Sequence, residues 1–228
     1  MPELFQRLPQ NVITIFRGRN LWYHLLAIVL TVLIVESDTD WTYYRWTRSE
    51  VIAHIALPAV VLGTFLPLIG ILALIIFGAV GRNRRIVSTG WVLGQTALLG
   101  YLISICYKAW TGRIPPPFRG FRMSAANAGF LVDTSHGFQF GFLKGGIFWG
   151  WPSSHTTVAF AMSFCLIALY PKNKKLVIAT LLYAFYIGLA VSVSIHWLSE
   201  FVAGAIIGSL IGRVVGKSAA TNQASRSS

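Results

Sequence analysis

Six long apolar stretches, separated by polar loops, occupy most of this 228-residue chain. Read with a window of about 20 residues, the length that a helix needs to cross a bilayer, they fall at about 21–36, 51–80, 88–107, 153–170, 176–195 and 199–215. Hydrophobic residues make up 55% of the chain and charged residues 11%, and the mean hydropathy is +0.64, which excludes an ordinary soluble protein. We therefore predict an all-α integral membrane protein, a bundle of six transmembrane helices.

The apolar stretches leave room for one domain. We expect a single membrane-embedded domain over residues 1–217, followed by a polar, low-complexity tail, residues 218–228, that is disordered in the cytoplasm. Gly63, Pro67 and Gly70 interrupt the second stretch. Because that stretch is too short to cross a membrane twice, we predict one kinked helix there.

The positions of lysine and arginine predict the orientation. If all six stretches cross the membrane, one face carries twelve of the nineteen basic residues and, among the acids, only Glu3. The twelve are Arg7, Arg17, Arg19, Arg82, Arg84, Arg85, Lys172, Lys174, Lys175, Arg213, Lys217 and Arg226. Since cytoplasmic segments are rich in lysine and arginine, we predict that both termini are cytoplasmic, in the inner (plasma) membrane of a bacterium. The positive net charge then requires no nucleic-acid partner, because it serves topology and attraction to anionic lipids.

The opposite face carries a long basic loop, residues 108–152, in which the single acid is Asp133. Its five cations are Lys108, Arg113, Arg119, Arg122 and Lys144. Such a loop attracts anions. The anion is either a substrate or the headgroups of lipids on which the loop rests.

Two histidines lie at the edges of apolar stretches on this same face. His155 ends the segment Pro152-Ser153-Ser154-His155, and His196 opens the segment His196-Trp197-Leu198-Ser199-Glu200. Polar groups at the edge of an apolar stretch are costly and often mark a functional site. His196 and Glu200 are four residues apart, so on a helix they share one face and can bond directly. Glu200 is equally explained as a favourable charge in the first turn of a helix.

Three segments in this order resemble the motifs of the type 2 phosphatidic acid phosphatase (PAP2) superfamily, integral membrane lipid phosphatases that share their site with vanadium haloperoxidases. The family pattern is K-x6-R-P, then P-S-G-H, then S-R-x5-H-x3-D. Here Lys108 opens the first segment, residues 152–155 match the second, and residues 196–200 end the third. The resemblance covers residues from about 90 to 215. It implies an all-α, six-span bundle of the PAP2 and vanadium-haloperoxidase type.

The chain departs from the family pattern at several positions. The first-motif arginine falls on Pro115, the second-motif glycine on Ser154, the Ser-Arg pair of the third motif on Leu189 and Ala190, and its aspartate on Glu200. Two arginines are therefore missing. We expect Arg113, two residues early, to replace the first. The candidates to replace the second are Arg119, Arg122 and Lys144.

The resemblance implies roles for three residues in the chemistry. His196 would attack phosphorus and form a phosphohistidine, and Glu200 would hold the other ring nitrogen of His196. His155 would protonate the leaving oxygen as the general acid. Phosphoryl transfer needs such a nucleophile and acid, together with cations or amides around the equatorial oxygens, where charge resides in the transition state.

The remaining candidates would bind the phosphate. Lys108 is the motif cation that stays in register, and Ser153 could donate its hydroxyl, although helix capping explains Ser153 equally well. Ser154 would leave a backbone amide available at the start of a helix, where anions bind. No group of residues has the spacing of a zinc or iron site, so we expect neither a metal nor another cofactor.

We therefore predict a membrane lipid phosphatase that hydrolyses a phosphate mono- or diphosphate ester of a lipid at the outer membrane face through a phosphohistidine, with membrane lipids as its other partners. Two alternatives remain open. A lipid phosphotransferase would pass the same phosphohistidine to a second lipid. A non-catalytic protein that binds or transports lipid headgroups would tolerate the loss of His196.

Overall fold

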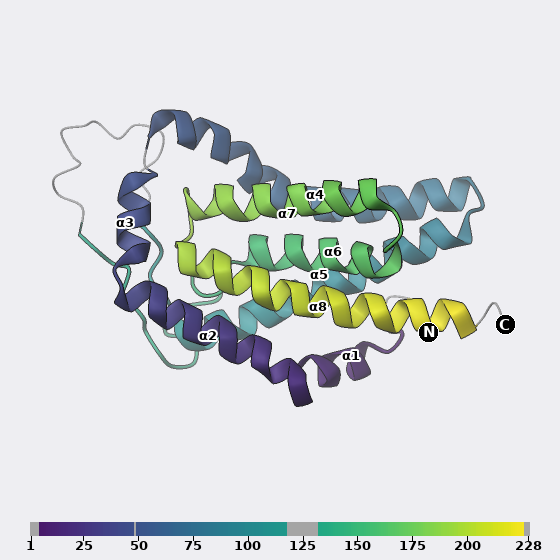
Figure 1. Ribbon diagram of the computed structural model, residues 1–228, viewed down its shortest axis with the longest axis horizontal. Helices are drawn as coiled ribbons and strands as arrows, with labels where there is room; N and C mark the ends of the chain where they lie inside the picture. Colours follow the sequence, from purple (N-terminus) through teal and green to yellow (C-terminus); the bar gives the residue numbers. More distant parts are fainter. Residues whose placement is uncertain (1–4, 48, 118–131, 226–228) are drawn as a thin grey trace.

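Helices are the sole regular secondary structure in the part of the chain that the computed structural model describes, residues 5–47, 49–117 and 132–225. Along the chain they are α1 (Leu8–Ile15), a short 3-10 helix η2 (Gly18–Asn20), α2 (Leu21–Glu36), α3 (Thr39–Trp46), α4 (Glu50–Val80), α5 (Arg84–Thr111), α6 (Ser154–Leu169), α7 (Lys174–Ser192) and α8 (Leu198–Ser225). The longest of them lie side by side in one bundle (Figure 1). The predicted all-α class is confirmed.

Five helical segments are long and apolar enough to cross a membrane: η2 together with α2 (Gly18–Glu36, 19 residues), α4, α5, α7 and α8. The protein is therefore an integral membrane protein. The fourth predicted span, α6, is apolar but has only 16 residues, because Pro152 and the cap Ser153 precede it and Pro171 follows it. The six predicted stretches thus become five helices of spanning length and one shorter helix.

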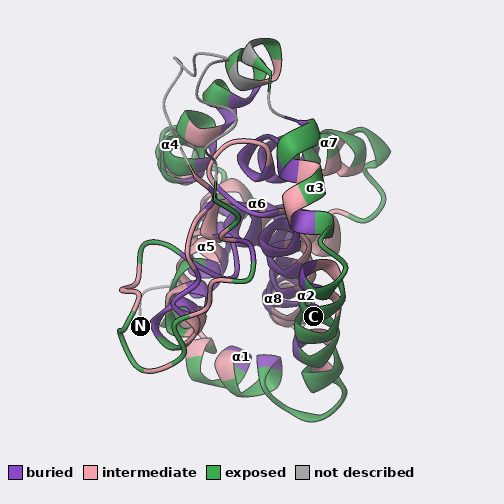
Figure 2. Cartoon of the chain, turned by 90° about the vertical axis from the view of Figure 1, so that its left-hand side faces the viewer, coloured by how far each residue is buried: buried purple, intermediate pink, exposed green. Residues whose placement is uncertain are grey.

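Helix α6 lies at the centre of the bundle, against α8; half of its residues are buried and the other half are partly buried (Figure 2). Glycines at every fourth position of α8 allow the two backbones to approach closely. A Cβ atom at Gly208 would lie 2.4 Å from the carbonyl oxygen of Thr157, and one at Gly212 would lie 2.1 Å from that of Ala161. This contact fixes the helix that begins beside His155 against the helix that begins beside His196.

Helix α4 is continuous although Pro58 and Pro67 lie inside it, as the prediction of one kinked helix requires. Figure 1 shows it changing direction before it runs along α5. Gly63 has a second role, because it lets α4 approach the neighbouring elements. A Cβ atom there would lie 3.1 Å from Cδ2 of His155 and 3.0 Å from Cγ2 of Ile187.

Two elements differ from the predictions. Helix α3 is a separate helix after the first predicted stretch, and it buries Asp40 and Tyr44 while Trp46 stays exposed. Helix α8 continues through Ser225, so residues 218–225, which we expected to be disordered, form its last turns. No glycine or proline follows Gly216, and the alanines of this segment favour a helix.

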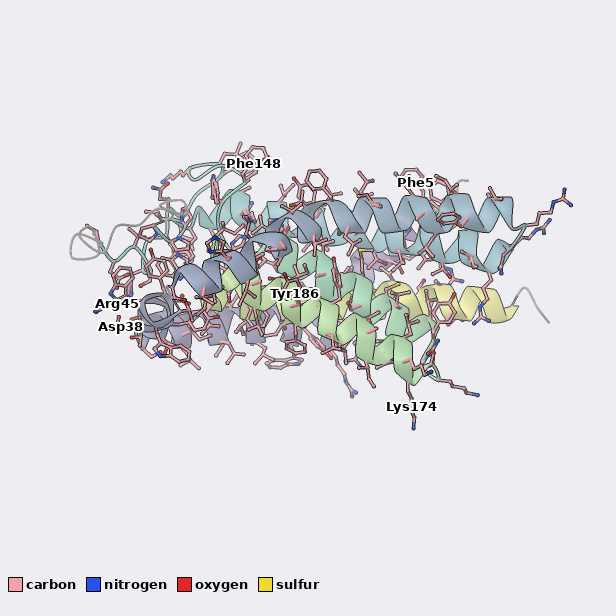
Figure 3. All side chains as sticks on the ribbon, turned by 90° about the horizontal axis from the view of Figure 1, so that it is seen from above. Phe5, Asp38, Arg45, Phe148, Lys174 and Tyr186 are labelled. Atoms are coloured by element: carbon pink, nitrogen blue, oxygen red, sulfur yellow. The ribbon has the colours of Figure 1, made fainter. Side chains whose placement is uncertain are left out.

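The labelled side chains identify the two ends of the bundle. Lys174 lies at one end, and Asp38, Arg45 and Phe148 lie at the other (Figure 3). The α4–α5 and α6–α7 connections and the last part of α8 lie toward the end that carries Lys174 (Figure 1), so the predicted cations of these three segments share one end of the bundle. The assignment of that end to the cytoplasm stays a prediction.

Candidate active site

His196 lies in the turn between α7 and α8, four residues before Glu200 in the first turn of α8. Its Nδ1 bonds to the Glu200 carboxylate, and both side chains are buried. A carboxylate only accepts hydrogen bonds, so Nδ1 carries the proton and Nε2 keeps its lone pair. The described residues give Nε2 no hydrogen-bond partner. The predicted pairing of His196 with Glu200 is therefore present, and it leaves one ring nitrogen available as a nucleophile.

The surroundings of His196 keep its ring neutral. Burial lowers the pKa of His196, the hydrogen bond and charge of Glu200 act in the opposite direction, and the positive charges of Lys108 and Arg113 lower it further. A neutral imidazole is the form that can attack phosphorus. The same interactions show that Lys108 and Arg113, predicted from two other segments, lie within electrostatic reach of His196.

His155 lies in the first turn of α6, and its ring centroid is 6.0 Å from that of His196. Its Nε2 lies 3.0 Å from Oγ1 of Thr64 on α4. Because Thr64 donates its one hydroxyl hydrogen to the carbonyl of Val60, at 2.8 Å, it accepts from Nε2 of His155. Nδ1 of His155 is buried without a hydrogen-bond partner. This nitrogen is therefore free to exchange a proton with a ligand.

Lys108 lies in the last turn of α5 and is almost completely buried. Its Nζ donates to the carbonyl of Phe148, at 3.1 Å, in the loop that returns toward α6. An ammonium group has three hydrogens, so two remain for a ligand. Lys108 also acts electrostatically on His155 as well as on His196. The structure thus places the predicted motif cation beside both histidines.

Ser153 and Ser154 form the start of α6. Ser153 is the N-cap, and its hydroxyl oxygen accepts hydrogen bonds from the amide and the hydroxyl of Thr156, while its own amide donates to the carbonyl of Glu200. Ser154 stands where the family has glycine, and its hydroxyl lies 2.9 Å from that of Ser104 on α5. The extra side chain of Ser154 is therefore accommodated by a small polar partner on the neighbouring helix.

Arg113, which we predicted to replace the first missing arginine, is buried beside Glu200. Its Nη atoms donate to the hydroxyl of Ser199, to Asp40 at 2.6 Å and to the carbonyl of Ser135 at 2.8 Å. Its Nε has no hydrogen-bond partner and lies 3.9 Å from Oε1 of Glu200, which has none either. Most donors of this guanidinium are therefore bound by the protein, and two of the five remain for a ligand or a bridging water.

The sequence analysis missed Asp40. This residue of α3 is completely buried, and its carboxylate accepts from Arg113, from the hydroxyl of Ser199 at 2.6 Å and from the backbone amide of Ser199 at 2.9 Å. The last bond caps the start of α8 from another helix, where a negative charge is favourable. Asp40 thus joins the first part of the chain to Arg113 and to the helix that carries Glu200. The one feature of the sequence that could have indicated this residue is an acidic side chain within a segment rich in aromatic residues.

The other predicted phosphate ligands are not assembled with these residues. Lys144 is exposed, and its methylene stem lies against Gly141 of the same loop. Arg119 and Arg122 lie outside the described residues. Ala190, on which the third-motif arginine falls, is buried in α7 against α4. In the described residues, the second missing arginine therefore has no replacement at the site.

Among the residues that the structure describes, one group could hold a metal ion. Asp38, Asp133 and His136 bring their ligand atoms within 4.8 Å of one another, and all three are exposed. The sequence did not indicate this group because α3 and the basic loop meet only in the fold. His136 pairs with Asp38 at 3.0 Å, so an exposed ion pair between two segments explains the arrangement without a metal.

The fold and the site define a helical integral membrane protein with two buried histidines, a carboxylate and two cations at one end of its bundle. Residues 89–224 match the PAP2 superfamily, which is more than half of the chain, so the protein belongs to that superfamily. PAP2 proteins are a phosphatase-like enzyme family and generally lipid phosphate phosphatases. No curated protein and no solved structure matches the chain. The matched segment begins in α5, so Asp40 and Thr64 are contributed by helices outside it.

Proposed function

We propose that this protein is a metal-independent lipid phosphatase that works through a phosphohistidine on His196 at the exterior face of the membrane. One observation supports this most. The bond between Nδ1 of His196 and Glu200 leaves Nε2 as the free nitrogen, in a buried site that also holds His155 and the cation of Lys108. A nucleophile, an acid and a cation are the groups that phosphoryl transfer requires.

In the first step, the Nε2 lone pair of His196 attacks phosphorus, and the bond from phosphorus to the lipid oxygen breaks. His155 enters this step as the imidazolium, with a proton on each ring nitrogen, and the leaving oxygen takes the proton of Nδ1, the nitrogen that has no partner within the protein. In the second step, His155 takes a proton from water, and the oxygen of that water attacks the phosphohistidine. Inorganic phosphate leaves, and both histidines return to their starting state.

The phosphate oxygens have several donors near this position. Lys108 has two free hydrogens, and the hydroxyl hydrogen of Ser153 is not committed to either of the two groups that donate to its oxygen. The first amides of α6 add the partial positive charge of a helix N-terminus. These groups would neutralise the transferring phosphoryl group, with Arg113 acting from behind Glu200.

The loop beside the site favours a lipid over a soluble phosphate ester. It exposes large apolar side chains next to the carbonyl that Lys108 contacts: Phe140, Phe142, Phe148 and Trp149. Aromatic side chains at the end of a membrane bundle are suited to the interface between headgroups and acyl chains. A headgroup that enters beside this loop reaches Lys108 without leaving the membrane surface.

The test is phosphate release by the detergent-purified protein in the presence of a chelator. Phosphatidate, a phosphatidylglycerophosphate and an isoprenoid lipid diphosphate are the probes, and labelled substrate quenched within one turnover should leave an acid-labile, base-stable label on His196. Release with this label supports the proposal. Labelling that proceeds to release only after a lipid alcohol is added would assign a transferase, and binding without labelling would assign a headgroup-binding protein.

The acid side of the pH profile follows from the lowered pKa of His196. Protonation removes the nucleophilic lone pair, so kcat/KM should fall only below the ordinary histidine value of 6.5. Glu200 stabilises the protonated ring and therefore raises its pKa. The variant Glu200→Gln should be slower, and its acid limb should lie at lower pH than that of the wild type. An acid limb that moves to higher pH would contradict this assignment of Glu200.

Thr64 should act as a positioning residue for His155. The variant Thr64→Val loses the acceptor for Nε2, so we expect kcat to fall about tenfold for an alkyl phosphate, the size of one lost hydrogen bond to a charged group. An activated aryl phosphate needs little protonation of its leaving oxygen and should lose less than about twofold. The matched control Thr64→Ser keeps the hydroxyl. Equal losses with both substrates would show that Thr64 only supports the fold.

A further inference from the structure

A polar cavity lies between α1, α2 and α8, on the second half of α8, away from the end where Glu200 lies. Its volume is about 510 Å³. Three cations line it, Arg7 at the start of α1 and Arg213 and Lys217 on α8, and none of its lining residues is acidic. Figure 1 shows α1 beside this half of α8. None of the proposed catalytic residues lies in this cavity.

The cations of this cavity are not neutralised by the protein. Arg213 and Lys217 are four residues apart on one helix, where two like charges repel modestly. Arg213 donates to the hydroxyl of Tyr23 at 2.9 Å, which is an uncharged partner. The described structure shows no ion pair for Arg7, Arg213 or Lys217. A bound anion would therefore reduce the repulsion among these three cations.

The wall formed by α1 is held by two polar contacts, one buried and one exposed. Asn11 lines the cavity, is 4% exposed, and donates through Nδ2 to Oε1 of Gln95 on α5 at 2.8 Å. Asn20, also in the lining, donates to the carbonyl of Thr14 at 2.8 Å and holds the turn between α1 and α2. The cavity is thus built from side chains that the fold holds in place, and it offers amide and hydroxyl groups beside the cations.

The surface next to the cavity is apolar. Ile13 and Phe16, near the end of α1, are 57% and 42% exposed, and Leu21 and Trp22, at the start of α2, are 50% and 68% exposed. These residues alternate with the polar residues that line the cavity. Exposed apolar side chains around a basic pocket at the end of a bundle suit the acyl chains of a lipid whose headgroup enters the pocket.

We propose that this cavity is a second ligand site, which binds the phosphate headgroup of an anionic phospholipid at the bundle end opposite the histidines. The ligand differs from the substrate of the proposed function, because a phospholipid diester offers no terminal phosphate for hydrolysis. The proposal therefore stands independently of the phosphatase reaction. Its chemistry is that of a phosphate anion between arginine and lysine donors.

The test is a titration of the detergent-purified full chain, followed by native mass spectrometry. The probes are phosphatidylglycerol, the zwitterionic phosphatidylcholine and the soluble sn-glycerol 3-phosphate. Phosphatidylglycerol should bind saturably, as one tightly held molecule, and at least about tenfold more tightly than phosphatidylcholine. The double variant Arg213→Gln/Lys217→Gln should weaken phosphatidylglycerol binding about thirtyfold, which corresponds to about one factor of five for each lost cation.

The matched control is Lys172→Gln/Lys174→Gln, which removes the same charge from the loop between α6 and α7 at the same end of the bundle. It should weaken binding less than about threefold. Equal weakening by the two double variants would overturn the proposal, because the cations would then act only through general surface charge. Competition by sn-glycerol 3-phosphate at similar concentrations would support the phosphate site and identify its ligand as soluble.

Arg213 also contacts Tyr23, so the double variant could lose structure as well as charge. The single variants Lys217→Gln and Arg7→Gln avoid this contact, and each should weaken phosphatidylglycerol binding about fivefold. Their thermal unfolding without lipid should match that of the wild type. Unchanged binding in both single variants would overturn the proposal.

Discussion

The variant His196→Ala is expected to release phosphate from lipid phosphates at least about 10⁴-fold more slowly than the wild type, because it lacks the proposed nucleophile. His196 is the residue whose Nε2 is left free by Glu200 in a buried site. His24 bonds to a backbone carbonyl and a tyrosine hydroxyl, His136 to an exposed carboxylate and His155 to Thr64, so none of these three should replace it. The measurement is phosphate release under saturating substrate. The second readout is the yield of labelled protein after an alkaline quench, which preserves the acid-labile label.

The matched control is His136→Ala. His136 lies near the same end of the bundle but is exposed and pairs with the exposed Asp38, so its loss should change the rate less than about twofold. The fold of His196→Ala has to be checked by thermal unfolding, because the variant leaves the buried Glu200 without its partner. Wild-type rates in the His196→Ala protein would rule out the phosphohistidine mechanism.

The variant Asp40→Asn is expected to have the second largest effect. It removes the negative charge that faces the buried Arg113 and weakens the cap on α8, so the free energy of unfolding should fall by about 3–5 kcal/mol. Phosphate release should fall about 100-fold, the usual loss when a preorganised charge moves out of place. Thermal unfolding and steady-state rates measure the two effects separately.

Two further variants separate charge pairing from simple loss of structure. In Asp40→Asn/Arg113→Gln both buried charges are gone, so stability should recover by about 2 kcal/mol relative to Asp40→Asn alone, while activity should not. The control Asp38→Asn removes an exposed acid two residues earlier and should change stability by less than about 0.5 kcal/mol. Additive effects of Asp40→Asn and Arg113→Gln would show that the two residues do not act as a pair.

The helices of this protein were largely predictable because lipid imposes a simple pattern. A spanning helix must be apolar for about 20 residues, and five of the six predicted stretches are helices of spanning length. The short helix α6 did not reach that length, because proline and a serine cap set its ends by local rules. Helix α3 was missed because its polar and aromatic residues carry no membrane pattern and are held by contacts with distant segments, such as Tyr43 with Ser192.

Some residues of the candidate site were likewise predictable from the sequence, and others were not. Residues four apart on one helix are neighbours by geometry, so the pair His196 and Glu200 followed from spacing. Motif order indicated Lys108 and His155 before any fold was available. The partners of Arg113 and His155 could not be predicted from the sequence, because Asp40 and Thr64 are 73 and 91 residues away along the chain.

The sequence by itself determined that this is a helical membrane protein, because hydropathy acts along the chain. The resemblance of its motifs to the PAP2 superfamily indicated Lys108, His155, His196 and Glu200 as site residues. Only the tertiary structure decided how the altered motifs are supported. Arg113 is held by Asp40, and Ser154 is accommodated by Ser104. Such compensation depends on which helices pack together, and long-range packing of side chains leaves no periodic signal in a single sequence.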